Sequence, residues 1–208
     1  MVNAVNSPHK FDKSNLRQVI IDAPKQFAVG FDIAGDVKVE GEFERVVFFG
    51  EGGSAFPASF VRILIADKRY LSGQLPIKFM QNYTYNLTPD SFGNTLNVFC
   101  SYSGNTEETI STLRQAIEKK LPAVAISSGG QVEQICRQSD IPFVKLPMPS
   151  ESFQPRMGTG YFVAAMLAVL ENARLTSDFS DEILESATGF GEKMEGFEKK
   201  VLESALKI

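Results

Sequence analysis

A run of hydroxyl-bearing residues separates an apolar strand from an amphipathic helix in residues 99–109, Phe-Cys-Ser-Tyr-Ser-Gly-Asn-Thr-Glu-Glu-Thr. Ser101, Ser103 and Thr106 place three hydroxyls beside the predicted start of the helix. The first backbone N–H groups of a helix have no intrahelical partner, and the helix dipole favours an anion there. Gly104 would let the backbone approach a ligand closely. This chemistry suits a phosphate group and requires neither a lysine nor a metal.

A second interpretation of the same segment is purely structural. The helix is predicted to begin near Asn105 or Thr106, so Asn105 can cap it, and Glu108 three residues later can complete a capping box. A cap accounts for Asn105 and Glu108 but not for the further hydroxyls. The residues alone leave both interpretations open.

A glycine-rich turn, Gly-Glu-Gly-Gly-Ser at residues 50–54, follows the buried strand that is predicted at residues 45–50. Ser54 can serve there as the N-cap of the next helix, which makes the turn a structural one. Alternatively, Gly52 and Gly53 leave backbone N–H groups open to a sugar, and Ser54 contacts it. The turn alone does not distinguish these two roles.

Arg156 follows a Pro-rich loop (residues 146–155) and leads into an apolar helix predicted at residues 159–174. A cation near a helix N-terminus opposes the dipole, so this placement suggests a function. Surface arginines are nevertheless mostly solvated, and that alternative stays open. Glu151 in the same loop and His9, the one histidine, are expected to be solvated surface residues.

Three segments together resemble the SIS (sugar isomerase) domains. Residues 101–109 are similar to the sugar-phosphate loop of that family, in the form with a central Tyr that is found in bifunctional phosphoglucose/phosphomannose isomerases. Residues 48–55, Phe-Phe-Gly-Glu-Gly-Gly-Ser-Ala, and residues 153–156, Phe-Gln-Pro-Arg, match two further motifs in the same order. The resemblance extends roughly over residues 45 to 175. The family usually has a small or apolar residue where Glu51 stands, so this carboxylate is a departure.

The resemblance implies an activity, the interconversion of glucose 6-phosphate, and of mannose 6-phosphate, with fructose 6-phosphate. It implies three groups of site residues: a phosphate-binding group, a sugar-binding group and one catalytic residue that stabilises an enediol-like intermediate. The phosphate-binding group consists of Ser101, Ser103 and Thr106, and the sugar-binding group consists of Gly53 and Ser54. The catalytic residue is Arg156.

The elements that must position these residues alternate along the chain. Short apolar runs bounded by turn residues alternate with helices, which predicts an α/β fold with a three-layer α/β/α sandwich and a parallel sheet of about five strands. Ligands in such sheets bind beyond the carboxyl ends of the strands, where both the turn and the hydroxyl segment fall. The predicted organisation is an N-terminal helical segment (1–40), an SIS domain (41–175) and a C-terminal helix (176–208) in which three glycines weaken the helix prediction.

Composition excludes several classes of protein. The chain has 208 residues and a net charge of −4 without any basic block, which argues against a nucleic-acid partner. No apolar run is long enough to span a membrane. Cys100 and Cys136, the two cysteines, are expected to be buried and reduced, which favours a cytoplasmic location. No Cys/His spacing suggests a metal site, and proton transfer between carbons needs no cofactor.

An aldose–ketose isomerase also needs a base and a group that opens the sugar ring. The family carries those residues in a second SIS domain, so the chain is expected to be the N-terminal half of a two-domain isomerase and to have that domain as a partner. A complete one-domain protein is the alternative. A regulatory module that binds sugar phosphates without catalysis is a second functional hypothesis, and a homodimer is expected in either case.

Overall fold

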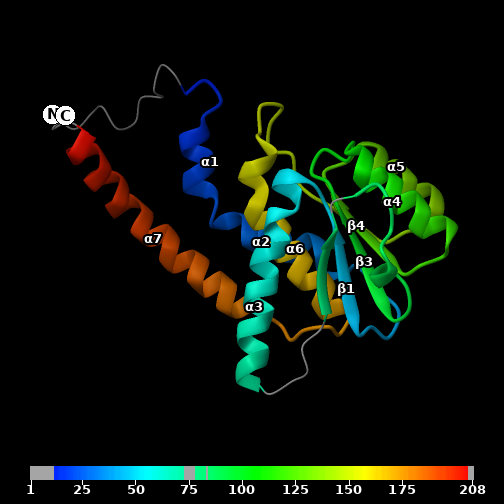
Figure 1. Ribbon diagram of the computed structural model, residues 1–208. Coiled ribbons are helices and arrows are strands. Elements are labelled where there is room, and N and C mark those ends of the chain that lie inside the picture. The colour runs from blue at the N-terminus through cyan, green and yellow to red at the C-terminus, as the bar shows by residue number, and fades with distance from the viewer. Residues whose placement is uncertain (1–11, 73–77, 83, 206–208) are drawn as a thin grey trace.

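Five strands pair in parallel in one sheet, in the order β2-β1-β3-β4-β5. The computed structural model describes residues 12–72, 78–82 and 84–205 (Figure 1). All six residues of β3 and all five of β4 are buried, as expected for strands covered on both faces. The strands are β1 (Arg45–Phe49), β2 (Lys78–Asn82), β3 (Thr95–Cys100), β4 (Ala123–Ser127) and β5 (Phe143–Lys145).

Helices cover both faces of this sheet, so the predicted three-layer α/β/α architecture is confirmed. Val46 and Phe48 of β1 face one core, which is shared with α2, α3 and α6, whereas Val47 and Phe49 face a second core under α4 and α5. Figure 1 shows these two sets of helices on opposite sides of the strands. The helices are α1 (Leu16–Asp22), α2 (Lys25–Gly35), α3 (Phe56–Ser72), α4 (Glu107–Glu118), α5 (Gly130–Ser139), α6 (Thr159–Asn172) and α7 (Ser180–Ala205).

The strand order creates a switch point between β1 and β3. The chain passes from β1 to β2 on one side, then crosses back to place β3 on the other side of β1. In sheets of this order the loops after the two strands diverge and leave a crevice at their carboxyl ends. The glycine turn and the hydroxyl segment therefore flank the position where such folds bind ligands.

The two C-terminal helices differ in how far they are covered. α6 is buried along residues 162–170, because α2 and α3 pack on it as well as the sheet. α7 is continuous across its three glycines and runs away from the sheet in Figure 1. Its first half contacts α2, but farther along Phe190 and Phe197 are 58% and 70% exposed.

Several predicted boundaries can be compared with the structure. Pro24 separates α1 from α2 within the predicted N-terminal helical segment. The helix that was expected from Ser54 begins at Phe56, because a short 3₁₀ helix, η1 (Gly52–Ser54), precedes it. His9 and the last three residues of the predicted C-terminal helix lie outside the described residues.

Candidate functional site

The hydroxyl loop (residues 101–106) and η1 lie side by side at the carboxyl edge of the sheet. β1 and β3 are hydrogen-bonded neighbours, and Phe49 lies opposite Phe99. The Ser54 hydroxyl oxygen accepts a 3.1 Å hydrogen bond from the Tyr102 backbone N–H, which ties the turn to the loop. Gly53 is exposed, and a Cβ atom added there would meet no atom within 4 Å. The backbone at Gly53 is thus open to a ligand, while Ser54 holds the two segments together.

Two of the three predicted phosphate-binding hydroxyls are paired with each other. The Oγ atom of Ser101 lies 2.8 Å from the Oγ1 atom of Thr106 and also accepts a 3.1 Å hydrogen bond from the Gly104 N–H. The Ser101 side chain is fully buried, whereas Thr106 is half-buried. Because the pair has two hydroxyl hydrogens and uses one between its oxygens, one hydrogen remains for a ligand.

Ser103 is the exposed hydroxyl of the loop. Its Oγ atom accepts a 3.3 Å hydrogen bond from the Asn105 backbone N–H, so its own hydrogen is available as a donor. The structure therefore brings all three predicted hydroxyls to one loop, with Ser103 at its surface and Ser101 beneath it.

The capping-box interpretation of Asn105 is wrong. The Asn105 Oδ1 atom accepts a 3.2 Å hydrogen bond from the Gln131 N–H, at the start of α5 rather than α4. Thr106 is the N-cap residue of α4 and makes no side-chain capping bond. The first N–H groups of α4 are thus left without a side-chain cap, beside the loop hydroxyls, where the helix dipole favours an anion.

Gly104 has a different role from the predicted one. Its φ angle is +68°, and a Cβ atom there would lie 1.8 Å from the carbonyl oxygen of Gly129. The Gly104 carbonyl in turn accepts a 3.0 Å hydrogen bond from the Val132 N–H. The space that was expected to admit a ligand is filled by the β4–α5 turn, which anchors the loop to the sheet.

Carboxylates surround this anion-favouring helix end. Glu107 and Glu108 occupy the first turn of α4, and Glu51 precedes η1. Burial raises the pKa of Glu51, and the charge of Glu108 raises it further. An anion at this helix end would be attracted by the α4 dipole and not by these three side chains, which are acidic.

Tyr102 joins the hydroxyl loop to the Pro-rich loop, and sequence reasoning had given it no role in the site. Its ring is 2% exposed and stacks on Phe153 at a centroid distance of 5.9 Å. Its hydroxyl donates a 2.6 Å hydrogen bond to the carbonyl oxygen of Pro147. A Cβ atom on Gly158 would lie 2.4 Å from the ring, so that glycine is needed for the close approach. Burial raises the pKa of the Tyr102 hydroxyl.

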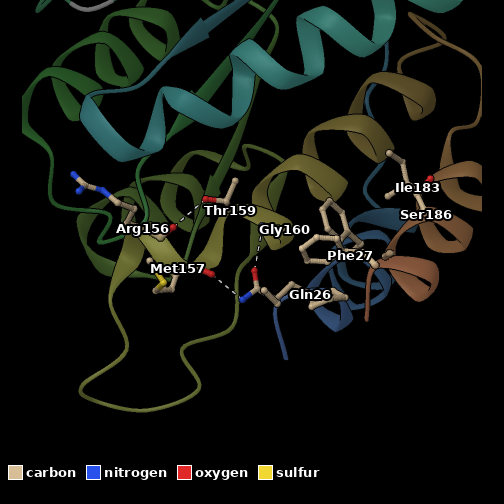
Figure 2. Close-up of a pocket in the computed structure, with 12 residues that line it drawn as sticks. Gln26, Phe27, Arg156, Met157, Thr159, Gly160, Ile183 and Ser186 are labelled. Carbon is tan, nitrogen blue, oxygen red and sulfur yellow. Dashed lines mark hydrogen bonds between the residues drawn. The ribbon is translucent and has the colours of Figure 1, made fainter. Parts of the chain in front are cut away.

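Arg156 lies in the 3₁₀ helix η3 (Pro155–Gly158), which contacts η1. The side chain is exposed, and its guanidinium makes no hydrogen bond or ion pair with the described residues. Arg156 is among the residues that line an apolar pocket of about 570 Å³ between α2, α6 and α7, but Figure 2 shows its guanidinium pointing away from Phe27 and Ile183, which line the same pocket. The three predicted motifs therefore meet at one edge of the sheet, with the arginine free to reach a ligand.

Other predictions concern groups outside this edge. Both cysteines are free and buried, as expected. Glu151 is exposed, as expected. Within residues 12–72, 78–82 and 84–205, no three His, Cys, Asp or Glu side chains are grouped as metal ligands, and no helix is long and apolar enough to cross a membrane.

Comparison with known proteins agrees with the resemblance seen in the sequence. A bifunctional phosphoglucose/phosphomannose isomerase of Caldicellulosiruptor bescii is 29% identical over 179 residues, which are 86% of this chain and 50% of that protein. Most of the chain is thus similar in sequence to bifunctional phosphoglucose/phosphomannose isomerases. No protein-family model matches it.

Two further matches define what these relatives share. The D-glucosamine-6-phosphate 4-epimerase of Sulfolobus acidocaldarius is 29% identical over 147 residues, 70% of this chain and 42% of the epimerase. The tagatose-6-phosphate ketose/aldose isomerase of Escherichia coli superposes with a TM-score of 0.56 at 16% identity, over 86% of this chain and 52% of that one. This structural match establishes the fold alone, which is that of SIS phosphosugar isomerases. The chain spans about half the length of the bifunctional isomerases it matches.

Proposed function

We propose that this chain is the substrate-binding half of an isomerase that interconverts glucose 6-phosphate and fructose 6-phosphate, and acts on mannose 6-phosphate as well. The observation that supports this most strongly is the convergence of the hydroxyl loop, η1 and η3 at the switch point between β1 and β3. The names of the curated relatives include phosphoglucose, phosphomannose and D-glucosamine 6-phosphate, all of them phosphorylated hexoses.

The phosphate group would bind between the uncapped N-terminus of α4 and the loop. Ser103 and the paired hydroxyls of Ser101 and Thr106 would donate hydrogen bonds to it. Hydrogen bonds to a charged group are stronger than neutral ones, about 1.5–3 kcal/mol each. The backbone at Gly53 and the side chain of Ser54 would contact the sugar.

The chemistry is a proton transfer between neighbouring carbons. A base removes the C2 proton of the open-chain aldose, the electron pair forms the C1–C2 double bond, and the C1 oxygen becomes an enediolate. A proton then moves from the C2 hydroxyl to the C1 oxygen, and return of the first proton to C1 gives the ketose. Arg156 would stabilise the enediolate, because a guanidinium stays charged and presents several donors in one plane. No step of this reaction requires a cofactor.

The base is expected to come from outside this sequence, in a second SIS domain. The aligned residues make up only 50% of each of two bifunctional relatives, which supports that expectation. A homodimer is part of the same proposal, and light scattering of the chain with and without the second domain tests both partners.

The first test is the melting temperature of the chain with fructose 6-phosphate, free fructose or inorganic phosphate. Ligand at about a hundred times its dissociation constant stabilises a protein by roughly 2.7 kcal/mol. For a chain of this size, that raises the melting temperature by roughly 5–10 °C. The expected order of shifts is sugar phosphate, then phosphate, then fructose. A shift with fructose equal to that with fructose 6-phosphate would contradict a phosphate-binding loop.

Turnover is tested with the chain and its second domain together, following conversion of glucose 6-phosphate to fructose 6-phosphate. Arg156→Met should lower kcat by about a hundredfold, since loss of one electrostatic stabiliser typically costs that much. Binding of fructose 6-phosphate without turnover in the two-domain protein would instead support the regulatory module.

A further inference from the structure

Gln26 is a buried residue of α2 whose side chain reaches the segment that carries Arg156. Its side chain is 4% exposed. The Nε2 group donates a 2.7 Å hydrogen bond to the carbonyl oxygen of Met157, and the Oε1 atom accepts a 3.1 Å bond from the Gly160 N–H (Figure 2). One amide therefore spans the junction between η3 and α6 from a helix more than 130 residues away in the sequence.

Two glycines make this reach possible. A Cβ atom on Gly160 would lie 2.8 Å from the Cβ atom of Gln26, and a Cβ atom on Gly30 would lie 2.7 Å from the Cβ atom of Ala164. α2 and α6 thus approach each other through glycine on both sides. The amide of Gln26 can then bond directly to the backbone at the start of the other helix.

The groups that Gln26 holds lie immediately after Arg156. Met157 is its neighbour, and Gly160 is in the first turn of α6, where the N-cap residue Gly158 provides no side-chain cap. The Thr159 hydroxyl donates a 3.0 Å bond to the Arg156 carbonyl, which closes the turn from the other side. Since the guanidinium has no partner among the described residues, the backbone of this turn determines where it extends.

We propose that Gln26 is a positioning residue for Arg156: it holds the η3–α6 turn so that the guanidinium meets the reacting carbons of the sugar. This inference rests on the proposed function of Arg156. Gln26 itself does not touch the substrate in this role. It acts through the Met157 carbonyl and the Gly160 amide.

Asn172 provides a matched control at the opposite end of the same two helices. Its Nδ2 group donates to the carbonyl oxygens of Ala34, Gly35 and Val37 at 3.0, 3.1 and 3.0 Å. Asn172→Leu removes this amide at roughly constant size, as Gln26→Met does near Arg156. Any effect that both variants share is therefore a general loosening of the α2–α6 contact.

The first experiment is amide hydrogen exchange of the full chain. Gln26→Met should speed exchange at Gly160 at least tenfold, because its N–H loses its acceptor. Gln26→Glu should restore protection there, since a carboxylate still accepts from Gly160. Asn172→Leu should leave residues 156–160 unchanged. Unaltered exchange at Gly160 in Gln26→Met would overturn the inference whether or not the chain binds a sugar phosphate.

The second experiment measures affinity for arabinonate 5-phosphate, whose carboxylate carries negative charge where the enediolate would. Gln26→Met should weaken this binding about tenfold and leave binding of inorganic phosphate unchanged. When Arg156→Met is already present, adding Gln26→Met should not weaken aldonate binding any further. Equal losses in Gln26→Met and Asn172→Leu, or full additivity with Arg156→Met, would contradict a positioning role. An Arg156→Met variant that binds the aldonate normally would instead show that the proposed function of Arg156 is wrong.

Discussion

The hydroxyl of Tyr102 donates a 2.6 Å hydrogen bond to the carbonyl oxygen of Pro147, and this bond links the hydroxyl loop to the Pro-rich loop that precedes Arg156. Tyr102→Phe should lower the free energy of unfolding by about 1 kcal/mol, because the carbonyl loses its partner. For a chain of this size the melting temperature should fall by about 2–4 °C.

Tyr161→Phe is the control for that prediction. Tyr161 is half-buried, and its hydroxyl makes no hydrogen bond with the described residues. Its removal should leave the melting temperature unchanged within about 1 °C. Equal losses in both variants would show that the Pro147 bond adds nothing.

Two glycines at the site should respond oppositely to alanine. Gly104→Ala places a Cβ atom 1.8 Å from the Gly129 carbonyl oxygen at a φ angle of +68°, so unfolding free energy should fall by at least ~3 kcal/mol. Gly53→Ala meets no atom within 4 Å and should fold normally, but it should weaken fructose 6-phosphate binding about fivefold. Thermal melts and ligand titrations separate the two effects. Normal sugar-phosphate affinity in Gly53→Ala would remove that residue from the site.

The hydroxyls of Ser103 and Ser101 should also differ. Ser103 is exposed, so Ser103→Ala should change stability by less than about 0.5 kcal/mol while weakening sulfate or fructose 6-phosphate binding about tenfold. Ser101→Ala removes a buried acceptor from the Gly104 N–H and should cost about 1–3 kcal/mol of stability. Loss of stability without loss of affinity in Ser103→Ala would mean that its hydroxyl is structural.

The raised pKa of Glu51 predicts a pH-dependent affinity for anions. This carboxyl takes up a proton at a higher pH than an ordinary glutamic acid, so as the pH falls it loses its negative charge before ordinary glutamates do. Sulfate remains a dianion while this carboxyl takes up its proton, so the dissociation constant of sulfate should fall as the pH is lowered from neutrality toward the ordinary pKa of a glutamic acid, about 4.3. The free energy of unfolding should rise over the same window, since the folded state holds this proton more tightly than the unfolded state.

Glu51→Gln should remove most of that pH dependence and strengthen sulfate binding at pH 8. His9→Asn is the control, because histidine side chains in general also take up a proton on mild acidification and His9 is the one histidine of the chain. A Glu51→Gln variant with the pH profile of the unaltered chain would contradict the assignment to Glu51.

Local patterns in the sequence were enough to predict the sheet and the meeting of the glycine turn with the hydroxyl loop. β4 is one apolar run with turns on both sides, and the carboxyl ends of adjacent parallel strands must meet at one edge. The errors concern partners that lie far along the chain. Asn105 resembles a local cap of α4, but its Oδ1 atom accepts a hydrogen bond from the Gln131 N–H at the start of α5. Gln26 gives no sign in the sequence of its bonds to Met157 and Gly160.

The contact between Gly104 and Gly129 has a thermodynamic consequence for binding. The hydroxyl loop is held there and by the Val132 N–H, so its backbone is ordered by folding rather than by a ligand. Ordering a residue costs roughly 1–2 kcal/mol of conformational entropy, and a preformed loop does not incur that cost at the moment of capture. Calorimetry of sugar-phosphate binding should accordingly show a small heat-capacity change, typical of a rigid receptor that needs no induced fit.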